Sequence, residues 1–237
     1  MTELYDAVPA IPPGKAMGCL PRKSKVGAVC PVFADHIELI PESEWDTYKG
    51  KISLRPYVKQ VLDQDGVGSC ATEGTAQGTM IARAFAGLPF VLLNPWFIYH
   101  TTSGGRDQGS SIDENLEFAR KYGIAPESVW PRSKGWQAKP SEEAYAAAKE
   151  FRILEFYDIT SIPEMVTALL KGFVVVYGSK GHCVVKVEHL DKTKGLDVNS
   201  WSESWGDKGF GVWATYAEVN WQYGAFAIRT TTEVKQP

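Results

Sequence analysis

Residues 64–70, Gln-Asp-Gly-Val-Gly-Ser-Cys, place a glutamine six positions before a cysteine, with two glycines between them. The stretch from about 69 to 86 predicts a helix, because it ends at a glycine that is soon followed by a proline. Gly74 and Gly78 inside it each weaken a helix by about 1 kcal/mol relative to alanine, which favours a helix packed tightly inside a core. The sequence therefore predicts Cys70 at the start of a buried helix.

A cysteine at a helix start is placed for nucleophilic chemistry. A thiol attacks as its thiolate, and an unperturbed cysteine is mostly protonated near neutral pH. The unpaired N–H groups and aligned peptide dipoles of a helix N-terminus favour the anion. Taken alone, Cys70 is still more typical of a buried structural thiol, so its interpretation depends on partner residues.

The chain offers four histidines as a possible base: His36, His100, His182 and His189. The first lies in an irregular N-terminal stretch, and the second follows an apolar helical segment where a structural role is the better interpretation. The other two share one predicted strand seven positions apart, so they point to opposite faces. We expect His189, beside a polar turn, to face solvent, which leaves His182 as the candidate base.

Asn199 is the candidate partner of His182. It begins the run Asn-Ser-Trp, residues 199–201, on a strand expected to neighbour that of His182. An amide oxygen there would fix the orientation and tautomer of the imidazole without adding charge, and Trp201 would shield this bond from water. Asn199 alone is better explained by a turn or strand end and Trp201 by a core position, while His182 alone fits a structural and a functional role about equally. Their joint occurrence in this order indicates catalytic chemistry.

These motifs resemble those of papain-like cysteine peptidases, over residues 40 to 232. The similar stretches are residues 64–70, Gly181-His182, Asn199-Ser-Trp201 with Trp205-Gly206 and Gly209-Phe210-Gly211, and residues 109–131, which resemble the cleft wall and second helix of that family.

The resemblance implies a role for each matching residue. Cys70 would be the nucleophile, His182 the general base and acid, and Asn199 the residue that orients the imidazole. Gln64 would stabilise the oxyanion together with the Cys70 backbone N–H. The substrate-binding residues implied are Gly109, Ser110 and Trp201, of which the first two would pair with an extended substrate chain.

The chain also departs from the family pattern. Ala71 stands where an aromatic residue usually follows the nucleophile, and Val67 stands where the family carries a disulfide cysteine. Both changes fit a reducing compartment. His182 and Asn199 follow Cys70 by 112 and 129 residues, against roughly 130 to 150 in the family signature, so substrate specificity is not carried over.

The predicted fold class is α+β and papain-like, with the active-site cleft between two lobes. A helical lobe spans about 60–150, and a β-barrel-like antiparallel lobe, rich in β-branched runs, spans about 151–232. Together they form a peptidase domain over residues 40–237. Residues 1–39 show no sustained period and are interpreted as an irregular extension or short pro-segment, with a permanently attached extension favoured.

Composition excludes several functional classes. The 237-residue chain has a formal net charge of −3 and no dense basic cluster, so no nucleic-acid partner is expected. No membrane partner and a cytoplasmic location are expected, because no apolar run approaches about 18 residues and the start is acidic. The four cysteines lack zinc-site spacing, so no metal or cofactor is expected; a Cys19–Cys30 bridge stays open, as does the oligomeric state.

The predicted function is that of a cysteine endopeptidase acting on polypeptides through a Cys70 thioester. Two alternatives stay open. The fold can serve as a non-catalytic binding or structural module with a blocked cleft, or the thioester can be transferred to an amine. Transferases of the second kind usually orient their histidine with aspartate, so Asn199 disfavours transfer.

Overall fold

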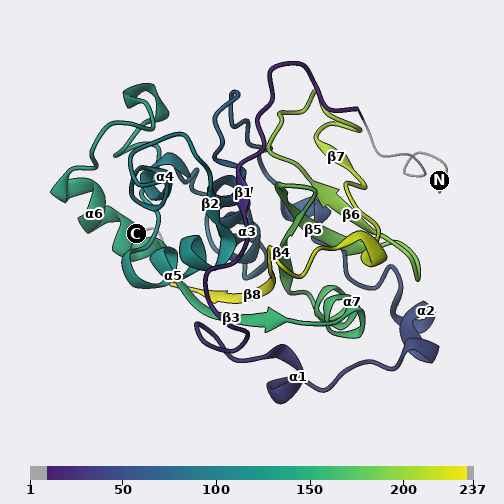
Figure 1. Ribbon diagram of the computed structural model, residues 1–237. Coiled ribbons are helices and arrows are strands. Elements are labelled where there is room, and N and C mark those ends of the chain that lie inside the picture. Colours follow the sequence, from purple (N-terminus) through teal and green to yellow (C-terminus); the bar gives the residue numbers. More distant parts are fainter. Residues whose placement is uncertain (1–9, 234–237) are drawn as a thin grey trace.

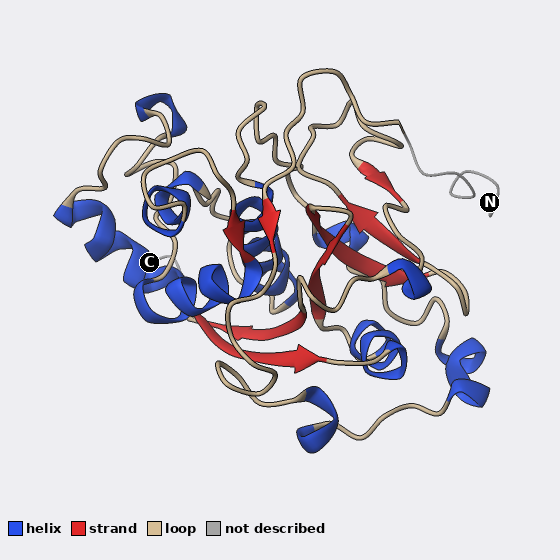
Figure 2. Ribbon diagram, viewed as in Figure 1, coloured by secondary structure: helices blue, strands red, loops and turns tan. Residues whose placement is uncertain are grey.

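The structure, a computed structural model, describes residues 10–233 (Figures 1 and 2), so the first nine residues of the predicted extension lie outside the described residues. The α-helices are α1 (Phe33–His36), α2 (Trp45–Tyr48), α3 (Cys70–Phe85), α4 (Trp96–Thr102), α5 (Ile112–Tyr122), α6 (Glu142–Ala148) and α7 (Ile162–Leu170). The strands are β1 (Cys19–Leu20), β2 (Ser110–Ser111), β3 (Ile153–Ile159), β4 (Val174–Ser179), β5 (His182–His189), β6 (Gly195–Val198), β7 (Phe210–Gly211) and β8 (Ala225–Thr231).

A six-stranded antiparallel sheet forms the centre of the second half of the chain. Its strand order is β3-β8-β4-β5-β6-β7, and β1 pairs separately with β2. The α+β architecture is thus confirmed, but the sheet is open and no closed barrel forms among the described residues. Its first strand, β3, lies at one edge and was not predicted from the sequence.

Helix α3 packs directly on the sheet, as the glycines predicted. All but its last two residues are buried. A Cβ atom at Gly74 would lie 2.7 Å from the Cys183 Sγ, and one at Gly78 would lie 2.9 Å from a Val176 methyl carbon. Both contacts would be too close, so glycine is what allows the helix backbone to approach β4 and β5.

Two hydrophobic clusters cover the two faces of the sheet. The first includes α3 and its neighbours α4 and α5, together with inward residues such as Val176 and Val185. The second lies on the other face, where Met165 and Leu169 of α7 pack with Trp45 of α2. The sheet therefore lies between helices on both faces, which fixes its position relative to α3.

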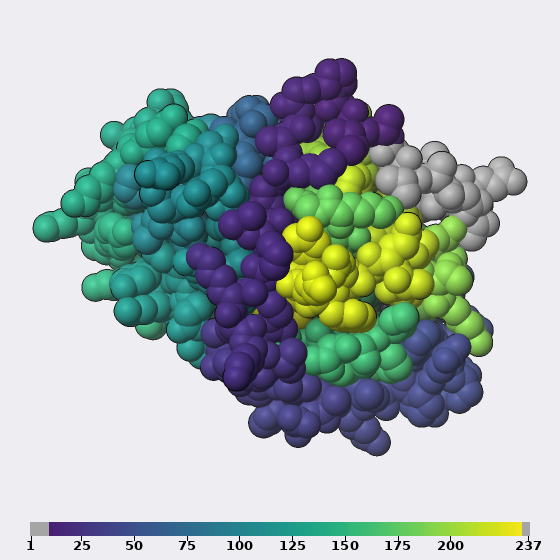
Figure 3. All heavy atoms as spheres, viewed as in Figure 1, coloured from purple at the N-terminus to yellow at the C-terminus, as the bar shows by residue number. Residues whose placement is uncertain are grey.

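The N-terminal stretch packs against the rest of the chain instead of standing apart from it. Phe33 of α1 is completely buried and makes edge contacts with the rings of Tyr157 and Phe173. Further upstream, the chain crosses the middle of the molecule between the helices and the sheet, where Figure 3 shows it in purple. Packing thus begins well before residue 40, where the sequence placed the start of the domain.

Within residues 10–233, none of the helices is both long enough and apolar enough to cross a lipid bilayer.

Replacing Gly123 with alanine is expected to destabilise the fold more than the same change at Gly87. Both glycines follow a helix with a positive φ, +84° and +77°, where any L side chain costs roughly 1–2 kcal/mol. A Cβ at Gly123 would also lie 1.7 Å from the Ala148 carbonyl oxygen, whereas Gly87 faces open space. Urea unfolding should show a loss of about 3 kcal/mol or more for Gly123→Ala and about 1 for Gly87→Ala. Equal losses would contradict the close contact between α5 and α6.

Candidate active site

Cys70 is the first residue of α3 and is completely buried. Its Sγ accepts a hydrogen bond from the backbone N–H of Gly18 at 3.3 Å, and the backbone N–H groups of Cys183 on β5 and of Ala71 lie near enough to favour the thiolate. The helix start therefore meets the sheet at this sulfur. Burial raises the pKa of the Cys70 thiol to about 12, although these backbone donors oppose the rise.

His182 opens β5 directly after a tight hairpin turn. Lys180 and Gly181 both have positive φ, 54° and 76°, and Ser179 pairs with His182 across the turn. Two such residues match the preferred two-residue turn between antiparallel strands. The turn leaves only two residues between β4 and His182, so it fixes where His182 lies. This agrees with the short spacing between Cys70 and His182 in the sequence.

The His182 ring is held by an amide and two tryptophans. Its Nε2 donates to Asn199 Oδ1 at 2.7 Å, while Nδ1 has no hydrogen-bond partner within the described part of the chain. Trp201 stacks on the ring with centroids 4.3 Å apart, and Trp213 meets it edge-on at 5.2 Å. Burial lowers the pKa of His182 to about 4, and the Asn199 bond only partly offsets this.

Asn199 follows β6, and hydrogen bonds to backbone groups fix its position and the orientation of its amide. Its N–H donates to the Gly209 carbonyl at 3.0 Å, and its Oδ1 accepts a second hydrogen bond from the Ser200 N–H at 2.7 Å. Because two N–H groups point at this one atom, the oxygen of the amide faces His182. The neutral imidazole then carries its proton on Nε2 and leaves Nδ1 as an acceptor.

Gln64 connects the two halves of the site. Its Nε2 donates to the carbonyls of Ala16 at 2.9 Å and Val67 at 2.7 Å, and its Oε1 accepts from Ser200 Oγ at 2.8 Å. Ser200 therefore holds the Gln64 side chain in place, a role that was not predicted. In the sequence, only its position inside the Asn-Ser-Trp run pointed to it.

Gly109 and Ser110 contact an extended backbone, which is that of the chain itself. The Ser110 N–H donates to the Gly18 carbonyl at 2.9 Å, and Cys19 pairs with Ser110 in the short β1–β2 ladder. A Cβ at Gly109 would lie 2.3 Å from that same carbonyl oxygen. Trp201, by contrast, is completely buried behind the His182 ring.

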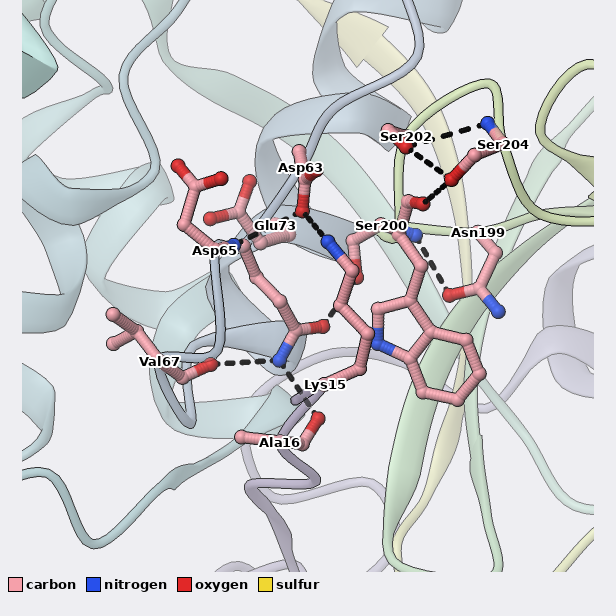
Figure 4. A network of polar contacts seen from close by, with 12 residues as sticks. Lys15, Ala16, Asp63, Asp65, Val67, Glu73, Asn199, Ser200, Ser202 and Ser204 are labelled. Carbon is pink, nitrogen blue, oxygen red and sulfur yellow. Dashed lines mark hydrogen bonds and ion pairs between the residues drawn. The ribbon is translucent and has the colours of Figure 1, made fainter. Parts of the chain in front are cut away.

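Residues 15–24, the covering segment, lie over this constellation. Besides the bonds of Ala16 and Gly18, the Cys19 N–H donates to the Gly181 carbonyl at 3.0 Å. Lys15 forms an ion pair with Asp63 at one end (Figure 4). The covering segment thus accepts hydrogen bonds from Gln64 and Ser110 and donates its own N–H groups to Cys70 Sγ and to the Gly181 carbonyl. Cys70 and His182 are both completely buried beneath this constellation.

Arg22 anchors the other end of the covering segment. Its guanidinium contacts both carboxylate oxygens of Asp158, at 2.9 and 2.6 Å, and that carboxylate is completely buried. The side chain of Ser24 donates to Asp113 Oδ2 at 2.6 Å. These charge-assisted bonds are stronger than neutral ones and hold the covering segment firmly.

The expectation that His189 faces solvent was wrong. The side chain is buried, and its Nδ1 is 2.8 Å from the Tyr216 hydroxyl. It also stacks on the Tyr216 ring and meets the edge of Trp45. These aromatic neighbours come from distant parts of the chain, and they make His189 a structural residue.

Comparison with solved structures identifies the fold. Xylellain, a cysteine protease from Xylella fastidiosa, is similar over 94% of this chain and 99% of its own, with a TM-score of 0.69 and 20% identity. Digestive procathepsin L 3 of Tenebrio molitor larvae is similar over 96% and 77%, with a TM-score of 0.62 and 16% identity. A recombinant stem bromelain precursor is similar over 87% and 76%, with a TM-score of 0.63 and 16% identity. No family profile and no curated protein sequence matches the chain.

Loss of the Arg22 anchor should expose Cys70. Because Arg22→Ala combined with Asp158→Asn removes two hydrogen bonds between charged groups, each worth roughly 1.5–3 kcal/mol, it should raise the iodoacetamide labelling rate of Cys70 by about tenfold or more. Lys23→Ala is the matched control, since its pair with Glu114 is exposed and such pairs contribute little. Equal labelling in the two variants, with unfolding stability measured in parallel, would show that Arg22 does not hold the covering segment.

Acid should weaken the covered state through His182. Its buried pKa of about 4 lies below the ordinary value of 6.5, so the unfolded chain binds the proton first as pH falls from 6.5 toward 4. The stability contributed by neutral His182 is therefore complete above pH 6.5 and is lost over that window. Urea unfolding at pH 7 and pH 5 should show a loss about 2 kcal/mol larger for the native chain than for His182→Gln. Glu73, whose pKa burial raises to about 7, has the opposite sign and is common to both proteins, so it cancels in the comparison.

Proposed function

We propose that this chain, which has the fold of papain-like cysteine peptidases, is itself a peptidase that hydrolyses peptide bonds in polypeptide substrates. The observation that carries the proposal is the bond from His182 Nε2 to Asn199 Oδ1, which leaves Nδ1 without a hydrogen-bond partner among the described residues. Helix α3, which begins with Cys70, packs against β5, which begins with His182.

In the proposed reaction, Nδ1 of His182 takes the proton of Cys70, and the resulting thiolate attacks the substrate carbonyl carbon. The tetrahedral intermediate collapses to a thioester when the same imidazole returns the proton to the leaving amine. Water then attacks the thioester with His182 again acting as base, which releases the acid product and restores the thiol. Asn199 keeps the ring in one tautomer throughout, and Trp201 shields that bond from water.

Gln64 and the wall residues supply binding in this proposal. The Gln64 Nε2, which now donates to the Ala16 carbonyl, would donate to the oxyanion once the covering segment leaves. The Ser110 N–H, which now donates to Gly18, would pair with the substrate backbone, and the absent side chain at Gly109 leaves room for it.

The state described here is latent, because both catalytic groups are buried in neutral form. The raised pKa of Cys70 and the lowered pKa of His182 both follow from burial under the covering segment. Release of that segment would return water to both groups and favour the thiolate–imidazolium pair. The same cover favours one second candidate, a binding or structural module whose site stays closed.

Product analysis in H₂¹⁸O separates the candidates. A peptide mixture incubated with the full chain, with and without the Arg22→Ala/Asp158→Asn change, should yield new carboxyl termini that carry ¹⁸O. Addition of a primary amine tests transfer, because transfer would place the amine on the new terminus instead. Cys70→Ala is the control and should give no cleavage, and absence of products from all forms would favour the closed module.

Gln64→Ala tests the oxyanion role in the same assay. Loss of one oxyanion donor commonly lowers kcat by about 10²- to 10³-fold, so a drop of that size is expected with a smaller change in KM. Iodoacetamide labelling of Cys70 forms no tetrahedral intermediate and should change by less than about threefold. A parallel fall in both rates would instead indicate that Gln64 only positions the loop before α3.

A further inference from the structure

Two thiols meet at the contact between the covering segment and the sheet. The side chain of Cys19, on the covering segment, lies beside Gly178, which pairs with Cys183 on β5, and both thiols are buried. The two thiols are close enough to change each other's pKa. All four cysteines of the chain are free thiols in the described structure. The peptidase mechanism uses neither member of this pair.

Glycines make the space in which these thiols lie. Gly178 on β4 pairs directly with Cys183, and a Cβ there would lie 3.1 Å from the Cys19 Sγ. On the other side, a Cβ at Gly74 of α3 would lie 2.7 Å from the Cys183 Sγ. Neither glycine has a positive φ, so both are explained by close approach and not by backbone conformation. A Cβ at Gly178 would also lie 2.3 Å from the Tyr223 Cβ, so this glycine leaves room for both the tyrosine and the Cys19 sulfur.

The backbone also fixes the register of Cys19. Its N–H donates to the Gly181 carbonyl, and the neighbouring Gly18 N–H donates to Cys70 Sγ. The covering segment therefore offers its backbone to the nucleophile and the Cys19 side chain to Cys183. This arrangement favours Cys183, and not Cys70, as the partner of the Cys19 thiol. The Cys19–Cys30 bridge that the sequence left open is not formed, since both residues are free thiols.

We propose that Cys19 and Cys183 are an oxidisable dithiol, and that their disulfide fastens the covering segment over the active site. The oxidant class is a small-molecule disulfide such as glutathione disulfide. The Cys19 thiolate attacks one of its sulfurs, forming a mixed disulfide and releasing one glutathione thiolate. Cys183 then attacks the Cys19 sulfur and releases the second glutathione. Two protein thiols are oxidised, one disulfide is reduced to two thiols, and the protons pass to the two leaving thiolates.

Docking of the covering segment controls the rate of this chemistry. Burial and the contact with Cys183 raise the pKa of Cys19, and burial raises the pKa of Cys183, so both are neutral and slow to react while the segment is docked. The first exchange therefore takes place while the segment is lifted, and redocking brings Cys183 to the mixed disulfide. The bond itself is independent of peptidase activity; only its inhibitory consequence rests on the proposed function.

The test uses the full chain in glutathione buffers of increasing oxidation, followed by acid quench, thiol blocking and peptide mass spectrometry. The expected product is a Cys19–Cys183 linked peptide pair, with Cys30 and Cys70 blocked as free thiols. Cys30→Ser is the matched control and should form the same link. A link from Cys19 to Cys70 or Cys30, or a stable glutathione adduct without any link, would overturn the proposal.

A second readout measures the consequence without relying on hydrolysis. Oxidation should slow iodoacetamide labelling of Cys70 by at least about tenfold, and dithiothreitol should restore it. In Cys19→Ser, oxidation should leave the Cys70 labelling rate unchanged. If the link forms but Cys70 labels equally fast, the disulfide does not fasten the covering segment. If labelling responds as expected while no peptide is cleaved in any form, the peptidase proposal fails and the dithiol remains.

Discussion

The close approach of α3 to the sheet is the constraint on which the site depends. Gly74 and Gly78 let the helix backbone come within contact of β4 and β5, so the helix N-terminus meets the strand that begins with His182. The Cys183 side chain lies directly against the helix at Gly74, one turn beyond Cys70. A side chain at either glycine would move the helix outward, and the two candidate catalytic residues would separate with it. Ordinary van der Waals packing thus sets the geometry of the chemistry.

A buried ion pair holds the strands that carry His182 and Asn199. Lys186 Nζ on β5 lies 2.9 Å from Asp197 Oδ1 on β6, and both side chains are completely buried. Asp197 also accepts hydrogen bonds from the Tyr177 hydroxyl and the Trp213 N–H. Because each charge is well paired, the network fixes the register of the two strands, although an ion pair at this depth adds little net stability. Asn199 follows Asp197 by two residues, so the network around Asp197 also fixes the position of Asn199.

Local signals account for what could be predicted from the sequence. The bounds of α3 follow from its terminal glycine and the proline soon after it, and the candidate residues from Gln64 to Asn199 follow from ordered motifs. The position of the covering segment could not be predicted, because most of its contacts with the site use the backbone of Ala16, Gly18 and Cys19. Backbone hydrogen bonds leave no side-chain signature. The burial of His189 was missed for a related reason, since its partners lie far away in the sequence.

The cover and the site belong to one chain, and this has a consequence for how the latent state responds to its surroundings. Occupancy by a tethered segment does not change on dilution, so the protein stays closed at any concentration. A competing polypeptide faces an effective concentration of the covering segment on the order of millimolar. Weak encounters with passing chains therefore cannot open the site; only a partner that binds the segment itself, or a change that loosens its anchors, shifts this balance.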